Sequence, residues 1–264
     1  MKKIKIFSII LFLFSAAVYA GCRVYDGAVT DHTPPVIAGE GMIQASVDDP
    51  GEKLLEGMSA EDDRDGDVTE SLVVQSISGF DEEGRRTVNY AAADGSGNVG
   101  YYSRQLEYTD YRTPVFSLSA PLRFPVGTSF NICSGISAES SLDGNLSDNI
   151  KYTLDRTVSA SAPGTYQIEF RVTDSAEKTS YLQTELEVYD PGEEQLEVTL
   201  TAYLVYLNVN DSFHASDYFQ ESETGGEPEI ESNVDTSKAG TYYVDYTVTE
   251  DGFTGKSRLI VVVR

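Results

Sequence analysis

The fold is decided by a strand pattern that is clearest at residues 164–174, which read Gly-Thr-Tyr-Gln-Ile-Glu-Phe-Arg-Val-Thr-Asp. Tyr166, Ile168, Phe170 and Val172 alternate with polar residues. Side chains along a β-strand point to opposite faces in turn, so these four apolar groups share one face. The pattern therefore predicts a strand with one face in a core and the other in water.

The same pattern occurs twice more. Residues 84–94 read Gly-Arg-Arg-Thr-Val-Asn-Tyr-Ala-Ala-Ala-Asp, and residues 240–250 read Gly-Thr-Tyr-Tyr-Val-Asp-Tyr-Thr-Val-Thr-Glu. The three copies begin at Gly84, Gly164 and Gly240, so the interval between successive copies is almost constant. A turn and a second alternating run follow each copy, which predicts that every repeat ends in a β-hairpin.

Six or seven short strands fit into each repeat, and this strand density is typical of a β-sandwich. We therefore predict an all-β chain of tandem sandwich domains, with short helical turns at residues 53–58 and 215–219. Clusters of Pro and charged residues suggest domain boundaries at 31–109, 110–190 and 194–264. The sequence leaves open whether the three domains extend as a stalk or fold back on one another.

The N-terminus predicts the compartment. Lys2, Lys3 and Lys5 precede an uncharged, mainly apolar run at residues 6–22. A helix of that length spans about 25 Å, close to the thickness of a hydrocarbon core. Because all three Lys precede the run and the acidic bulk of the chain follows it, the positive-inside rule predicts an extracytoplasmic location for the remainder of the chain.

Residues 1–25 are thus a signal peptide or a membrane anchor, and three fates are open. The run can be retained as a signal anchor, or cleaved after Ala20 as a secretory signal. Alternatively, Ala20-Gly21-Cys22 resembles the end of a bacterial lipobox, which would make Cys22 the lipidated residue, although Tyr19 stands where lipoboxes usually have Leu.

Three motifs carry a family resemblance: Thr33-Pro-Pro-Val-Ile37, Asp65-Gly-Asp-Val-Thr69 and Pro163-Gly-Thr-Tyr166. They resemble bacterial surface Ig-like domains, of the type also described from an insecticidal crystal protein. The resemblance covers about residues 31–264 and is less complete in the third copy, which opens differently. It implies Ig-like sandwiches that act as spacers or binding modules, with no shared catalytic residues.

Composition excludes several classes of function. The chain has 19 Lys and Arg against 43 Asp and Glu, a net charge of −24, which disfavours binding to nucleic acids. It has only two Cys and two His, too few for a Cys/His metal cluster. No nucleophile set or cofactor loop is evident, so we expect a non-enzymatic protein without a cofactor.

One acidic cluster offers a weak candidate for Ca²⁺, through Asp63, Asp65 and Asp67. The spacing of Glu61, Asp63, Asp65 and Gly66 partly fits an EF-hand loop, but Leu72 stands where that loop needs its bidentate Glu. We therefore expect a solvated turn without a metal, in which Gly66 takes a positive φ and Asp side chains cap the backbone.

The sequence does not identify the binding partner; an unknown surface protein and a glycan are both compatible with it. Tyr101-Tyr102 and Tyr242-Tyr243 are adjacent in strands, so one of each pair must point outward. Exposed Tyr can stack on sugars, which suggests the alternative of a carbohydrate-binding accessory module. A further hypothesis places the main contact on the third domain, at loop 222–228 and at the hairpin tip that carries Phe253.

Overall fold

A computed structural model of the protein describes residues 2–264. The chain forms two compact units, Met1–Asp110 and Tyr111–Arg264, and each is described by itself below.

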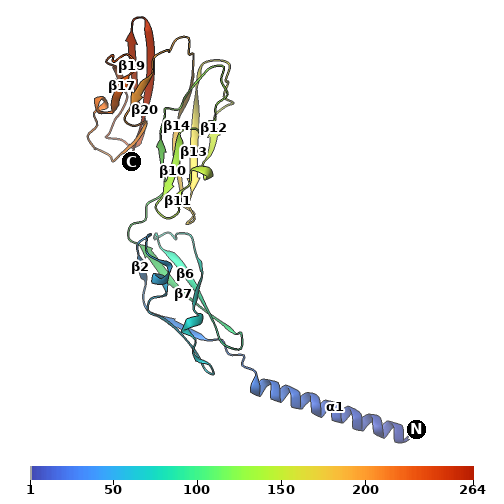
Figure 1. Ribbon diagram of the computed structural model, residues 1–264. Helices are drawn as coiled ribbons and strands as arrows, with labels where there is room; N and C mark the ends of the chain where they lie inside the picture. Colours follow the sequence, from blue (N-terminus) through green and yellow to red (C-terminus); the bar gives the residue numbers. More distant parts are fainter. Residues whose placement is uncertain (1) are drawn as a thin grey trace. The chain divides into compact units, whose positions relative to one another are not determined.

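The first unit opens with helix α1, Lys2–Val29, which Figure 1 draws in blue. Its stretch Ser8–Tyr25 is long and apolar enough to cross a membrane, and none of it is buried. Ile10, Phe12 and Phe14 are among its large exposed side chains. A helix with apolar residues all round finds its stable environment in lipid or in an export channel rather than in water.

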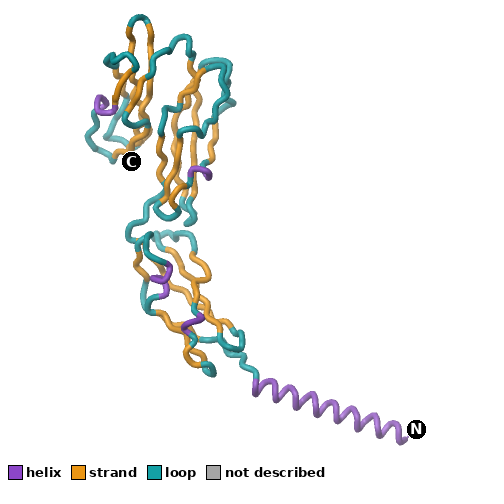
Figure 2. Tube along the Cα trace, viewed as in Figure 1, coloured by secondary structure: helices purple, strands orange, loops and turns teal. Residues whose placement is uncertain are grey.

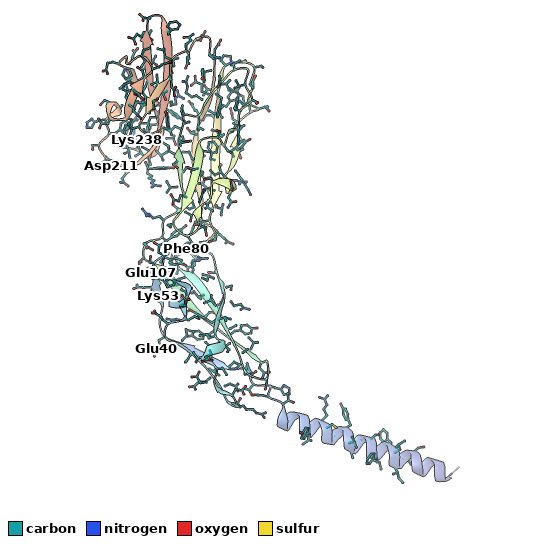
Figure 3. All side chains as sticks on the ribbon, viewed as in Figure 1. Glu40, Lys53, Phe80, Glu107, Asp211 and Lys238 are labelled. Carbon is teal, nitrogen blue, oxygen red and sulfur yellow. The ribbon has the colours of Figure 1, made fainter. Side chains whose placement is uncertain are left out.

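Seven strands and two short 3₁₀ turns follow and form a β-sandwich (Figure 2). The strands are β1 Val36–Gly39, β2 Ile43–Ala45, β3 Met58–Asp62, β4 Gly66–Asp67, β5 Val73–Ile77, β6 Arg86–Ala93 and β7 Val99–Tyr108; the turns are η1 Gly51–Leu55 and η2 Thr69–Ser71. One sheet has the order β1-β3-β4 and the other β2-β7-β6-β5. All strand pairs are antiparallel except β2 with β7, which is parallel. Across this pair, the side chain of Gln44 donates a hydrogen bond to Glu107, which is labelled in Figure 3.

The core of this sandwich lies between its two sheets. Ile37 and Ala60 come from the first sheet, and Val88, Tyr90 and Leu106 from the second. Burying a side chain of this size contributes about 1.5–3 kcal/mol, so the alternation of buried and half-buried residues along β6 fixes its register. The buried Tyr90 hydroxyl donates to the carbonyl of Leu54 at 2.6 Å, which satisfies its polar group.

The second unit contains two more sandwiches, of which copy two repeats both sheets of copy one and copy three has a smaller sheet of two strands instead of three. Copy two has β8 Val115–Leu118, β9 Arg123–Pro125, β10 Ile136–Ser140, β11 Gly144–Asn145, β12 Lys151–Leu154, β13 Gly164–Thr173 and β14 Thr179–Tyr189, with η3 Ser147–Asn149. Copy three has β15 Val198–Leu200, β16 Leu204–Leu207, β17 Phe219–Ser222, β18 Glu229–Ser232, β19 Gly240–Glu250 and β20 Phe253–Val263, with η4 Ala215–Tyr218. Sheet orders β12-β13-β14-β9 and β16-β20-β19-β18 repeat the four-stranded sheet of the first copy, each with one parallel pair.

Copies two and three pack side by side within this unit, so there they do not extend end to end (Figure 1). Ile260 of β20 belongs to the hydrophobic cluster of copy two. Arg123, whose side chain is 7% exposed, pairs with Glu187 of its own copy and with Glu194 at the start of the third, both at 2.7 Å. Burial opposes the charge of Arg123, but the two carboxylates outweigh it and raise its pKa.

The all-β prediction is confirmed, with tandem sandwiches after an N-terminal helix. The predicted hairpins are β6–β7, β13–β14 and β19–β20, and the predicted helical turns correspond to η1 and η4. The 3₁₀ turns η2 and η3 were not predicted, because three residues are too few to carry a helical period. The domain boundaries at 31–109, 110–190 and 194–264 stay predictions.

Candidate functional site

Four aspartates converge at one end of the first sandwich: Asp31, Asp62, Asp65 and Asp94. Each offers one carboxylate oxygen, and these four oxygens all lie within 4.8 Å of one another. Among the side chains that the structure describes, this is the one such meeting of three or more acidic, His or Cys residues. Asp65 is exposed, and the other three are buried.

The turn after β3 places Asp62 and Asp65. One oxygen of Asp62, Oδ1, accepts backbone bonds from Arg64 and Asp65, both at 2.9 Å. Gly66 then has a positive φ, in the left-handed region that glycine adopts without strain. The turn therefore holds the two carboxylates close together on the same side of the chain.

The hairpin turn after β6 supplies Asp94 and joins the two loops. The Asp94 Oδ1 accepts the backbone N–H groups of Ser96 and Asn98, at 2.9 and 2.8 Å. The Oδ2 of Asp65 accepts the N–H of Gly95 at 2.7 Å, which ties the β3–β4 turn to this hairpin. Burial disfavours the charged Asp94, but hydrogen bonds from Asn98, Ser96 and Gly97 outweigh it and lower its pKa.

Asp31 reaches the cluster from the segment between α1 and β1. Its Oδ1 accepts the N–H of Thr33 at 2.9 Å, and its main-chain carbonyl accepts the Asn98 side chain at 3.3 Å. The Asp31 side chain is 5% exposed and that of Asp62 7% exposed, yet Oδ2 of each is buried and accepts no hydrogen bond. A buried carboxylate oxygen without a partner is costly, and two of them beside two further carboxylates raise that cost by repulsion.

The structure gathers a set different from the predicted Asp63, Asp65 and Asp67. Asp65 is in the cluster, whereas Asp63 is exposed outside it. Asp67 accepts the N–H of Thr69, the first residue of η2, at 2.9 Å. Hydrogen bonding from the Thr69 side chain and N–H lowers the pKa of Asp67. Asp31 and Asp94 were missed because they lie far from the acidic run in the sequence, one before it and one after it, and only the strand pairing brings them to it.

Copy two builds the same turns with other chemistry. The hydroxyl of Ser140 accepts from Leu142 and Asp143 as Asp62 does in copy one, and Asp143 accepts the N–H of Ser175 as Asp65 accepts that of Gly95. Asp174 repeats Asp94, but its Oδ2 accepts the hydroxyl of Tyr111 at 2.6 Å. Copy two therefore has the neutral Ser140 where copy one has the charged Asp62, and the hydrogen-bond donor Tyr111 in the segment where copy one has Asp31.

Other candidate surfaces are simpler. Tyr101 is the outward member of its pair, at 67% exposed, while Tyr102 donates to the carbonyl of Gly39. Tyr243 packs against copy two, so its outward direction is covered within the second unit. Phe253 at the third hairpin tip is 52% exposed.

No family model matches the chain. It is 28% identical over 212 residues to the pesticidal crystal protein Cry22Aa of Bacillus thuringiensis, and the match covers 73% of this chain. The same match covers only 27% of Cry22Aa, so the chain spans about a quarter of that relative's length. These findings fit a protein of β-sandwich domains, and the Ig-like family resemblance stays a prediction.

Two kinds of solved structure are similar at low scores. One contains CBM51-2 with GlcNAc and the INT domains of Clostridium perfringens ZmpB, at 18% identity and a TM-score of 0.23, covering 87% of this chain and 42% of that one. Another is Drosophila N-cadherin EC1-4, at 13% identity and a TM-score of 0.21, covering 74% and 66%. The fold described above rests on the strands and registers of this chain itself.

Proposed function

We propose that the protein is a non-enzymatic, membrane-tethered array of β-sandwich domains that works outside the cytoplasm of a bacterium as a spacer and adhesion module. The observation that carries the proposal is the apolar stretch Ser8–Tyr25, none of which is buried against the sandwiches. Such a helix does not serve the core of the protein. Lys2, Lys3 and Lys5 all precede the apolar stretch, and Arg23 near its C-terminal end is the single basic residue within it. The sandwiches follow directly, at Val36.

The partial likeness to Cry22Aa, a protein of Bacillus thuringiensis, supports a bacterial setting for the sandwiches. The adhesion role is supported by the fold: a sandwich commits one face of each sheet to its core and leaves loops and edges for contact. Phe253 and the neighbouring hairpin tip are one such exposed contact point on the third copy.

Protease treatment of intact cells tests the location, with an antibody to the C-terminus as the readout. We expect digestion of the sandwiches in intact cells. Full protection before lysis, followed by digestion after lysis, would contradict the proposal.

Two single-cysteine variants test how the chain is attached to the membrane. If Cys22 is lipidated, Cys22→Ala moves the protein from the membrane to the soluble fraction, whereas Cys133→Ala, the matched control, leaves it in the membrane. If the helix is a retained anchor, both variants stay in the membrane and only deletion of residues 6–22 releases the sandwiches. Release of the wild-type chain into the medium would show cleavage instead of a tether.

A carbohydrate-binding accessory role is the second candidate, favoured by one repeated feature. Tyr101 and Tyr181 occupy equivalent positions, next to Ala91 and Arg171 in the register, and are 67% and 60% exposed. Binding to a glycan array that is lost in Tyr101→Ala or Tyr181→Ala, but kept in Tyr243→Phe, would support it. Tyr152 of the same sheet as Tyr181 is also exposed, at 45%, but it lies opposite the buried Phe170 and so on the core-facing side of the sheet. One outward tyrosine per sheet fits the spacer better than a flat aromatic platform.

A further inference from the structure

We propose that Asp31, Asp62, Asp65 and Asp94 form a calcium site that fastens the segment after helix α1 to the first sandwich. The inference goes beyond the proposed function and does not depend on it, because it rests on the interior of one domain. Its starting point is the convergence of four carboxylates from three separate segments of the chain.

The first argument is electrostatic. Four carboxylates whose oxygens lie within 4.8 Å of one another repel strongly when they are ionised. Ion pairs do not relieve the four: none of the nine salt bridges found among the described residues includes one of them. A bound cation is the simplest source of compensating charge.

The second argument is the hydrogen bonding. Asp31 and Asp62 each use Oδ1 to fix a turn, and each leaves a buried Oδ2 without a donor. Both side chains are more than nine-tenths buried, so these oxygens are also withdrawn from bulk water. An oxygen that is held rigidly, charged and unpaired is well suited to bind a metal ion, because the ion satisfies both its charge and its lone pairs.

The donor set selects the ion. Ca²⁺ binds six to eight oxygens at about 2.3–2.6 Å, so two ligands on opposite sides of it lie about 4.8 Å apart. The four oxygens lie within that span. Mg²⁺ prefers one or two carboxylates and keeps several waters. Among the described side chains, no thiolate or imidazole, the ligands of softer metals, joins the cluster. Four hard carboxylates, one of them exposed, therefore favour Ca²⁺ with water completing its shell.

The positions of the four ligands in the chain indicate what a bound ion would do. Asp31 lies two residues beyond the end of α1 and five before the start of β1. The other three ligands belong to the sandwich, on the turn after β3 and the turn after β6. An ion bound to all four would hold residues 30–35 against the sandwich and stiffen the connection to the helix.

The experiment uses the full chain in detergent micelles. Calcium binding is measured by isothermal titration calorimetry, and thermal unfolding is followed in EDTA, in 10 mM CaCl₂ and in 10 mM MgCl₂. We expect the melting temperature of the first unit to rise by about 5–10 °C in calcium and by much less in magnesium. Hydrogen exchange of the peptide containing Thr33 is expected to slow in calcium only.

Asp62→Asn is the decisive variant, because asparagine keeps Oδ1 as an acceptor for the turn while removing the charge. It should weaken calcium binding at least tenfold and yet melt above the wild type in EDTA, since one repulsive charge is gone. Asp63→Asn makes the same charge change in the same loop outside the cluster and should leave calcium binding unchanged. If Asp62→Asn fails to fold, Asp31→Asn gives the same test from the other segment.

Three outcomes would overturn the proposal. One is the absence of calcium heat and of any calcium-dependent rise in melting temperature in the wild type. Another is a rise that persists undiminished in both Asp62→Asn and Asp31→Asn. The third is an equal loss in Asp63→Asn, which would mean that calcium only screens the acidic surface.

Discussion

In the first copy, Asp62 accepts the two backbone bonds that close the turn after β3, and in the second copy the hydroxyl of Ser140 accepts the equivalent pair. The same holds one strand later, where Asp67 and Asn145 accept the N–H groups of Thr69 and Ser147, the first residues of η2 and η3. These pairs show that the turn geometry needs an oxygen but not a charge. The charge of Asp62 therefore calls for another explanation, and its unpaired Oδ2 beside Asp31 provides one.

The copies also differ in how the equivalent hairpin aspartate is satisfied. Asp94 accepts the side-chain amide of Asn98 at 2.6 Å, and Asp174 accepts the phenol of Tyr111 at the same distance. In copy two the tyrosine comes from the segment just before β8, so a side chain of the protein itself ties that segment to the sandwich. Copy one has Asp31 in its incoming segment, where the carbonyl of Asp31 accepts the Asn98 side chain and the proposed ion would add a second tie through the carboxylate.

The largest expected effect tests whether the copies are stabilised separately. Phe170 is fully buried in copy two, at the position that Tyr90 holds in copy one. Phe170→Ala should destabilise the second unit by about 3–5 kcal/mol. Because Ile260 belongs to the same cluster, the third copy should lose stability with it, while the first unit's unfolding transition stays in place.

Scanning calorimetry of the full chain in micelles measures this, with Tyr90→Ala as the reciprocal variant. Tyr90→Ala should lower only the transition of the first unit. A shift of both transitions in either variant would show that the two units are coupled.

A second prediction concerns how copy one seats its incoming segment. A Cβ on Gly100 would lie 1.9 Å from the carbonyl oxygen of Pro35, a collision with backbone that no rotamer relieves. Gly100→Ala should cost about 2–3 kcal/mol and displace the segment that carries Asp31, which weakens calcium binding as well. Gly51→Ala is the control, because its added methyl group meets nothing within 4 Å; equal urea midpoints for the two variants would contradict the argument.

Strand positions were predictable from sequence, and the metal ligands were not, for a physical reason. The alternation of Tyr166, Ile168, Phe170 and Val172 is local, and burial of one face fixes the strand and its register. The acidic run at residues 61–67 was also visible, but its members have different tasks: Asp67 accepts the N–H of Thr69, and within the run only Asp62 and Asp65 belong to the cluster. Which acids meet depends on the pairing of β1 with β3 and on the hairpin after β6, and this is long-range information.

The side-by-side packing of copies two and three could not be predicted from the sequence either. Arg123, Glu187 and Glu194 look like ordinary surface charges in the sequence, whereas in the fold they form a largely buried group between two sandwiches. Charged residues are usually solvated, so a sequence pattern gives no reason to place them in an interface.

A third prediction concerns a substitution that gives copy two the acidic residue of copy one. Ser140→Asp keeps an acceptor for the turn but sets a new carboxylate beside Asp143 and Asp174. Repulsion and burial of the new charge should cost about 1–3 kcal/mol. We expect no calcium response, because the Tyr111 hydroxyl already binds Asp174. Urea unfolding with and without 10 mM CaCl₂ checks it against Ser140→Asn, and a calcium-dependent gain in stability would show that Tyr111 does not keep the cation out.

The smallest expected effect removes the tyrosine donor. Tyr111→Phe keeps the ring and deletes the hydroxyl that binds Asp174 Oδ2, while Oδ1 still accepts the N–H groups of Ala176 and Lys178, at 3.0 and 2.9 Å. The carboxylate is buried, so losing one of its donors should cost about 1 kcal/mol, whereas Tyr181→Phe, on an exposed ring, should cost close to nothing. The two urea midpoints, measured on the same day in the same micelles, give the difference directly. If Tyr111→Phe is as stable as Tyr181→Phe, the phenol is not what fastens the incoming segment of copy two, and the parallel with a calcium-held segment in copy one loses its support.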